Sequence, residues 1–227
     1  MTSSTTNQRT ADSSAEQAIN EFATGNPVLI HDAADREGET DIIYPAATVD
    51  ASAVAQLRQD AGGLICTAVS ASVAERMSLP FLHDELSHPA ADAHQLEYDE
   101  RSSFSLPVNH RDTYTGITDT DRAQTIRALA EAAADDEFDE RDFAAEFRSP
   151  GHVTILRGAV GLLESRRGHT EFGLALADAA GQPPAVVVCE MLDGSTGTAT
   201  SPKRAREYAE THDIVYIEGA VLTQRFS

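Results

Sequence analysis

The sequence predicts a single α+β domain, and three observations support this class. Segments with the apolar spacing of helices alternate with short apolar runs typical of strands, but the alternation is irregular. No internal repeat or proline-rich linker divides the chain. A length of 227 residues, 41% of them hydrophobic, suits one domain with a sizeable core. We therefore expect a polar, disordered tail at residues 1–13 and one domain over residues 14–227.

The expected strands are short apolar runs that end at glycine, proline or polar residues. The run at 41–44 stops at Pro45, and the run at 185–189 is almost continuously apolar, as a fully buried strand is. In chain order the expected strands are residues 28–30, 41–44, 64–69, 103–108, 153–156, 185–189 and 214–217.

The expected helices carry apolar residues at helical spacing and begin at residues that can cap them. The clearest covers residues 120–134, with Asp119 or Thr120 as its N-cap, and Ser201 followed by Pro202 opens another in the usual order. The remaining expected helices are residues 14–24, 50–60, a short one that begins at Ser70 and ends before Pro80, 170–180, and a short one that closes the chain. Polar residues 78–100 are expected to be irregular, and acidic residues 135–146 to form a surface excursion.

The charge balance excludes several classes of protein. The chain carries 37 Asp and Glu against 17 Lys and Arg, a formal net charge of −20, and its only lysine is Lys203. Binding to nucleic acid or to an anionic membrane requires clustered cations. No apolar run approaches the roughly 18–20 residues needed to span a bilayer, and residues 1–14 lack the apolar stretch of a secretory signal. Cys66 and Cys189 are too few for a disulfide framework, so we expect a cytoplasmic protein.

The first candidate site is the acidic segment from Asp35 to Asp41. In an extended chain, alternate residues share a face, which would bring Asp35, Glu37, Glu39 and Asp41 together. Carboxylates at such distances repel one another and need a cation or protons, and Mg²⁺ takes oxygen ligands. The alternative is a solvated acidic turn, a common feature in so acidic a chain.

The second candidate site, Arg166 to Glu171, precedes an expected helix. The free N–H groups and positive dipole at a helix N-terminus suit a phosphate. Arginine, glycine and the Thr170 hydroxyl would complete a phosphate grip, and His169 could offer a nitrogen to a metal. Alternatively, Thr170 is an ordinary N-cap and the arginines form a surface patch.

Single residues elsewhere are weaker candidates. His152 follows a Pro-Gly pair, and Glu190 ends the apolar run 185–189, so both are candidates for proton transfer. They could equally be a structural histidine and an exposed strand end. Cys66 lies within an apolar run and fits a small core residue better than a nucleophile.

Six blocks of the sequence, taken in order, resemble the motifs of the 3,4-dihydroxy-2-butanone-4-phosphate synthase family. The resemblance runs from about Asn26 to Arg225. The blocks are Asp35 to Asp41, Gly63 to Cys66, Thr115 to Thr118 with Asp121 and Arg122, Pro150 to Val153, Arg166 to Glu171, and Val188 to Glu190.

The resemblance implies a mixed β-sheet surrounded by helices and a role in riboflavin biosynthesis. The reaction it implies converts D-ribulose 5-phosphate to L-3,4-dihydroxy-2-butanone 4-phosphate and formate by enolisation, dehydration, skeletal rearrangement and loss of C4. It further implies a divalent metal, Mg²⁺ or Mn²⁺, and a homodimer with its sites at the subunit interface. The chain ends near Ser227, so we expect a monofunctional form.

By position, the resemblance also implies roles for individual residues. Glu37 and His169 would be metal ligands, and His152 and Glu190 would be essential to catalysis. The implied substrate contacts are Arg36, Glu37, Asp41, Arg166, Arg167, Gly168, His169, Thr170 and Glu190. The residues expected to line the site are Asp35, Glu39, Cys66 and Thr118. Arg167 stands where many family members have glycine, so it could strengthen phosphate binding or point away from it.

Two other functions remain open on the sequence alone. A second metal-dependent enzyme of sugar phosphates, an isomerase or aldolase, would share the acidic segment and the phosphate grip but release no formate. A non-catalytic acidic cation-binding or scaffold protein would need neither His152 nor Glu190.

The near absence of lysine and the dense carboxylates indicate a protein from a halophile with a high-salt cytoplasm. At molar salt the Debye length is about 3 Å, so repulsion between surface carboxylates is screened. We expect the chain to lose its folded structure as salt is lowered, followed by circular dichroism in decreasing KCl. Full stability without added salt would contradict this origin and leave a merely acidic protein.

Overall fold

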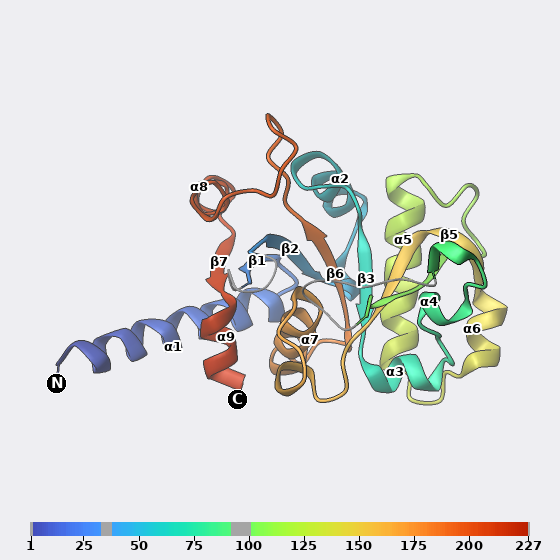
Figure 1. The fold of residues 1–227 in the computed structure, drawn as a ribbon, viewed down its shortest axis with the longest axis horizontal. Coiled ribbons are helices and arrows are strands. Elements are labelled where there is room, and N and C mark those ends of the chain that lie inside the picture. The colour runs from blue at the N-terminus through green and yellow to red at the C-terminus, as the bar shows by residue number, and fades with distance from the viewer. Residues whose placement is uncertain (1, 33–37, 92–100, 227) are drawn as a thin grey trace.

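The protein has the expected α+β fold, with helices on both faces of a seven-stranded mixed sheet (Figure 1). The structure, a computed structural model, describes residues 2–32, 38–91 and 101–226, with side chains from residue 13 onward. The strands are β1 (Val28–His31), β2 (Thr40–Pro45), β3 (Cys66–Val69), β4 (Phe104–His110), β5 (Phe147–Arg157), β6 (Ala185–Glu190) and β7 (Val215–Glu218).

The sheet order is β4-β5-β3-β6-β2-β1-β7. Strands β3 and β5 are parallel, as are β1 and β7, whereas every other neighbouring pair is antiparallel. The helices are α1 (Thr2–Ala23), α2 (Ala51–Asp60), α3 (Ala71–Arg76), α4 (Leu82–Glu85), α5 (Asp119–Ala134), α6 (Glu140–Glu146), α7 (His169–Ala179), α8 (Pro202–His212) and α9 (Gly219–Phe226).

Alternation along the strands divides the core into two clusters. Ile42 and Val187 face one cluster, which contains side chains of α2, α3, α5, α6 and α8. Their neighbours Ile43 and Val186 face the other cluster, which contains side chains of α1, α7 and α9. Both faces of the central strands are therefore covered, which explains their continuous apolar runs. In Figure 1, α1, α7 and α9 lie close together beside the strands that they cover.

The strand register brings two acidic residues to the same end of the sheet. Asp41 at the start of β2 pairs with Glu190, the last residue of β6. Each lies two positions along its strand from an apolar residue of the second cluster: Asp41 precedes Ile43, and Glu190 follows Val188. Because side chains two positions apart on a strand share a face, Asp41 and Glu190 face the side on which α7 packs.

Helix α5 begins one residue earlier than expected. Its N-cap is Thr118, not Asp119 or Thr120, and the Thr118 hydroxyl accepts a hydrogen bond from the backbone N–H of Asp121 at 3.1 Å. The Asp121 carboxylate in turn accepts the backbone N–H of Gly116 at 2.8 Å. The motif from Thr115 to Arg122 is therefore the capped start of a helix.

The acidic segment 135–146 does not form a simple surface excursion. It contains α6, capped by Asp139. Phe138 and Phe143 are each only 8% exposed and belong to the first core cluster. The Phe143 ring stacks on that of Phe147 with centroids 4.8 Å apart. The charged side chains of the segment reach solvent, while the rings of Phe138 and Phe143 pack in the core and hold the segment in place.

Other element boundaries also differ from the sequence pattern. Strand β5 begins at residue 147 and not at the expected residue 153, because residues before 153 also pair with β4. The register of this pairing is irregular. Part of the stretch expected to be irregular, 78–100, forms α4 and a 3-10 turn at Pro89–Ala91. Helix α1 begins at Thr2 and so runs through residues 2–13. Disorder of that tail in solution stays a prediction.

Within the described ranges, no helix combines the length and the apolar character that crossing a membrane requires.

Candidate active site

The centre of the candidate site is a buried pair formed by Asp41 and His169. The His169 Nδ1 atom lies 3.4 Å from Asp41 Oδ1, and both side chains are less than a tenth exposed. His169 is the first residue of α7, whose close packing on the sheet places it there. A Cβ atom at Gly173, one turn further along, would lie 2.9 Å from Val186 and 3.1 Å from Ile43. Only glycine allows this approach.

Glu190 joins this centre from the neighbouring strand. It pairs with Asp41 in the sheet register and is half-buried. Its backbone carbonyl accepts the N–H of Gly62 at 2.6 Å. A Cβ atom at Gly62 would lie 3.0 Å from that carbonyl oxygen, so glycine suits the position. The backbone at Glu190 is thus held by two separate parts of the chain.

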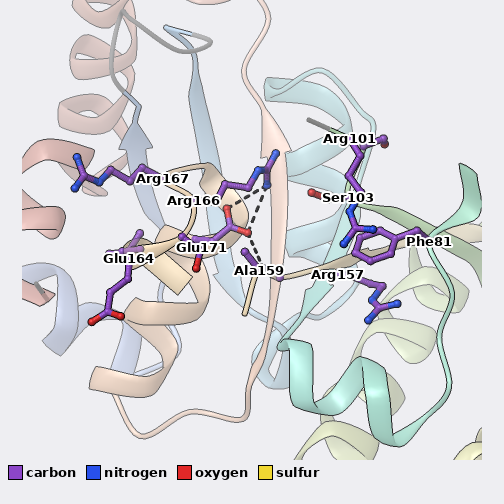
Figure 2. A pocket seen from close by; sticks show the side chains of 13 residues that line it. Phe81, Arg101, Ser103, Arg157, Ala159, Glu164, Arg166, Arg167 and Glu171 are labelled. Carbon is purple, nitrogen blue, oxygen red and sulfur yellow. Dashed lines mark hydrogen bonds and ion pairs between the residues drawn. The ribbon is translucent and has the colours of Figure 1, made fainter. Parts of the chain in front are cut away.

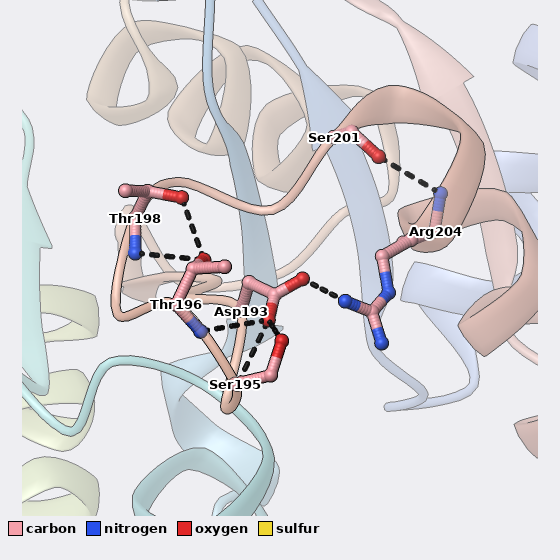
Figure 3. A network of polar contacts seen from close by, with 6 residues as sticks. All are labelled: Asp193, Ser195, Thr196, Thr198, Ser201 and Arg204. Carbon is pink, nitrogen blue, oxygen red and sulfur yellow. Dashed lines mark hydrogen bonds and ion pairs between the residues drawn. The ribbon is translucent and has the colours of Figure 1, made fainter.

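The turn that follows Glu190 is closed by hydrogen bonds to Asp193 (Figure 3). The Asp193 carboxylate accepts the backbone N–H groups of Ser195 and Thr196 and pairs with Arg204. These hydrogen bonds, that of the Ser195 side chain first, lower the pKa of Asp193 to about 2. The same turn leads into α8, where Ser201 accepts the backbone N–H of Arg204.

Cys66 lies on β3, beside β6, and faces the same side of the sheet. Burial, and to a smaller extent the nearby Cys189 and Asp41, raise the pKa of the Cys66 thiol to about 12. A thiol with such a pKa stays protonated near neutral pH and is a poor nucleophile. Its electrostatic interaction with Asp41 is consistent with a residue that lines the site, which stays a prediction.

Helix α7 begins without a side-chain cap. Its N-cap is Gly168, so Thr170 is not the cap that the simpler interpretation of this segment expected. Thr170 is instead inside the first turn and 4% exposed. A helix start that lacks a side-chain cap leaves backbone N–H groups available to an anion.

Arg166 is held by the buried carboxylate of Glu171. The Arg166 Nη1 atom lies 3.1 Å from Glu171 Oε2 and 3.4 Å from Oε1. Glu171 is fully buried, and its Oε1 atom also accepts the backbone N–H of Ala159 at 3.0 Å. Figure 2 shows the Glu171 carboxylate between these two donors. A buried charge needs such partners, so this ion pair fixes where the Arg166 guanidinium lies.

A cavity of about 680 Å³ opens beside this ion pair. Arg166 and Arg167 line one side, and Arg101 and Arg157 line the other, where their guanidinium carbons lie 3.5 and 4.2 Å from the centre of the Phe81 ring. Arginines thus line this cavity on both sides, in a chain with net charge −20. Figure 2 shows the Arg167 guanidinium directed away from that of Arg166.

His152 lies apart from this centre within one chain. It is exposed on β5, and β3 lies between β5 and β6, the strand that carries Glu190. In the described part of the chain, its hydrogen bonds go to Asn109, a 4% exposed residue of β4.

Several predicted residues need separate mention. Asp35, Arg36 and Glu37 lie outside the described residues. Glu39 is half-buried, and its backbone N–H donates to the Asp32 carboxylate at 2.9 Å. Thr118 caps α5, as described above. For the described residues alone, no group of three potential ligands among His, Cys, Asp and Glu could hold a metal ion.

Sequence reasoning missed three kinds of residue. Glu171 was noted only as the end of a motif, although its position five residues after Arg166 brings the two together at a helix start. Arg101 and Arg157 carry no local motif, and only the fold places them opposite Arg166. Asn109 gave no clear signal, because it lies one residue beyond the expected strand 103–108.

The fold is a mixed sheet covered by helices, and carboxylates and an imidazole meet at one end of it. Together with the arginine-lined pocket, these features define a class of enzymes. A model of the family described as 3,4-dihydroxy-2-butanone 4-phosphate synthase matches residues 16–225. The chain therefore belongs to the 3,4-dihydroxy-2-butanone 4-phosphate synthase family, as its motifs predicted.

Individual relatives agree with this assignment. The chain is 49% identical to the 3,4-dihydroxy-2-butanone 4-phosphate synthase of Archaeoglobus fulgidus over 221 residues, which cover 93% of each chain. It is 42% identical to that of Methanosarcina mazei, over 92% of this chain and 90% of the relative.

Solved structures with that name have the same fold. The Candida albicans synthase superposes with a TM-score of 0.77 at 28% identity, over 93% of this chain and 96% of its own. A synthase in complex with two magnesium ions superposes with a TM-score of 0.75 at 27% identity, over 91% of this chain and 93% of its own.

Proposed function

We propose that this protein converts D-ribulose 5-phosphate to L-3,4-dihydroxy-2-butanone 4-phosphate and formate, a step of riboflavin biosynthesis. The observation that carries the proposal is the meeting of Asp41, His169 and Glu190 at one end of the sheet, with an arginine-lined pocket around the residues that flank His169 in sequence. A ketose phosphate needs both features: polar groups for its oxygens and a cationic site for its phosphate.

The phosphate is assigned to the start of α7. Gly168 lets a ligand approach the backbone closely, the N–H groups of the first turn point toward it, and Thr170 adds a hydroxyl. Arg166, oriented by Glu171, supplies a positive charge. Arg36, and Arg167 if its side chain turns inward, would add to this charge.

A divalent metal would be held by Glu37 and His169. His169 fits this role because it offers an imidazole beside the Asp41 carboxylate in a buried setting. A mixed set of carboxylate and imidazole suits both Mg²⁺ and Mn²⁺. The bound metal would polarise the substrate carbonyl and stabilise the negative charge that forms on enolisation.

Proton transfers are assigned to His152 and Glu190. Enolisation removes a proton next to the carbonyl, and the dehydration that follows requires a proton for the departing hydroxyl. A half-buried carboxylate such as Glu190 can hold or accept a proton at the sheet end, and the imidazole of His152 has a nitrogen that can accept or donate one. Skeletal rearrangement and loss of C4 as formate would follow in the same site.

The active enzyme is proposed to be a cytoplasmic homodimer with sites at the subunit interface. Its support is the exposure of His152 and its separation from Glu190 by strand β3. A second copy can bring its own His152 to the centre formed by Asp41 and Glu190. The acidic surface supports the further proposal of a high-salt cytoplasm.

The reaction is tested by assaying formate from ribulose 5-phosphate with Mg²⁺ in molar KCl. We expect formate from the natural sequence and a loss of at least about 100-fold in both Glu190→Gln and His152→Ala, since general acid–base groups contribute on this order. Circular dichroism should show both variants folded. A sugar phosphate product without formate would indicate an isomerase or aldolase instead.

Metal binding is tested by calorimetric titration of Mg²⁺ and by electron paramagnetic resonance of Mn²⁺. His169→Ala and Glu37→Gln should each weaken binding, by roughly tenfold or more. His212→Ala removes an exposed histidine from the end of α8 and serves as the matched control, with unchanged affinity expected. Equal affinity in all variants would refute the ligand assignment.

The shared site is tested by mixing two inactive variants. If His152 and Glu190 of one site come from different chains, a mixed dimer of His152→Ala and Glu190→Gln contains one intact site. Random exchange should then restore about a quarter of the natural activity, because half of the dimers are mixed and half of their sites are intact. No recovery, with exchange verified by native mass spectrometry, would place both residues in one chain.

A further inference from the structure

Asn109 is a buried residue whose side-chain amide contacts two separate segments of the chain. It lies on β4, and its side chain is enclosed by the segment Thr115–Gly116 on one side and Gly151–His152 on the other. Its Oδ1 atom accepts the backbone N–H of His152 at 2.8 Å, and its Nδ2 atom lies 3.5 Å from the carbonyl oxygen of Thr115. These backbone partners decide which end of the amide is oxygen and which is nitrogen.

Glycines on both sides fit the space that Asn109 requires. A Cβ atom at Gly116 would lie 2.1 Å from Asn109 Nδ2, and its φ of +84° favours glycine in any case. A Cβ atom at Gly151 would lie 2.0 Å from the carbonyl carbon of Val108, the residue before Asn109. Gly116 therefore packs directly against the Asn109 side chain, and Gly151 on β5 packs against the backbone beside it.

The same amide also contacts the imidazole ring of His152. The His152 Nδ1 atom lies 3.2 Å from Asn109 Nδ2 and 3.3 Å from Oδ1. When His152 is ready to accept a proton at Nε2, its ring proton is on Nδ1, and Oδ1 can accept it. After Nε2 has taken up a proton, the His152 ring still carries the proton on Nδ1. The Nε2 atom makes no hydrogen bond within the described ranges and points to no partner there.

We propose that Asn109 is a positioning residue for catalysis, which anchors the Nδ1 side of His152 so that Nε2 exchanges protons with the substrate. This inference rests on the proposed function, in which His152 transfers a proton. Asn109 reaches the reaction only through the histidine. The backbone hydrogen bond fixes the position of residue 152 and the ring contact fixes the rotation of its side chain, so one amide controls both.

Two substitutions separate this role from a structural one. Asn109→Ala removes both contacts to His152 and the contact to Thr115. Asn109→Asp keeps an oxygen for the backbone N–H and for Nδ1–H but loses the donor to the Thr115 carbonyl. Ser105→Ala is the matched control, because Ser105 is also buried on β4 and its hydroxyl donates to the Pro80 carbonyl, away from His152.

The readout is formate release, resolved into kcat and KM, with thermal unfolding of each variant. We expect Asn109→Ala to lower kcat by roughly 10- to 100-fold with KM nearly unchanged, as for other residues that orient a functional imidazole. Asn109→Asp should recover most of that loss at its own pH optimum. Ser105→Ala should retain kcat, even if its unfolding temperature falls as much as that of Asn109→Ala.

Three results would overturn the inference. Asn109→Ala could retain kcat, the two Asn109 variants could be equally impaired, or Ser105→Ala could lose as much kcat as Asn109→Ala. The second result would trace the effect to the Thr115 contact, and the third to stability alone. Failure of the natural sequence to release formate would instead contradict the proposed function, so the two failures are distinguishable.

Discussion

Helix α7 can lie directly on β2 and β6 because residue 173 is glycine, and the centre of the site depends on this contact. A larger residue would push the helix away from Ile43 and Val186. His169 at the helix start would then move away from Asp41, since the two atoms that meet are only 3.4 Å apart. The ion pair between Arg166 and Glu171 joins the same helix start to the loop before it.

The carboxylates of the candidate site differ from the many on the surface because they are buried. Glu171 and Asp41 are almost fully enclosed, and each has a cationic or imidazole neighbour within about 3.5 Å. A buried carboxylate without such a partner would be strongly unfavourable. In contrast, Phe138 and Phe143 show how an acidic surface segment is held in place by apolar contacts while its charges remain in water.

Local patterns predicted much of the molecule, and long-range contacts account for most of the rest. Apolar runs located every strand of the sheet, because alternation and burial are local properties. The sheet order, which sets Asp41 beside Glu190, depends on pairing between distant segments and came only with the structure. The same holds for Arg101 and Asn109, whose neighbours are far away in sequence. The cap of α5 was misplaced by one residue because Thr118, Asp119 and Thr120 can all serve as caps.

The hydrogen bonds around Asp193 have a consequence for the behaviour of the strand end in acid. A carboxyl with a pKa of about 2 contributes to stability above its ordinary value of 3.8, and the contribution is lost only as the pH falls through about 2. The turn that leaves Glu190 therefore stays closed under mild acid. A loss of activity above about pH 4 would then arise elsewhere in the molecule, with this turn still in place.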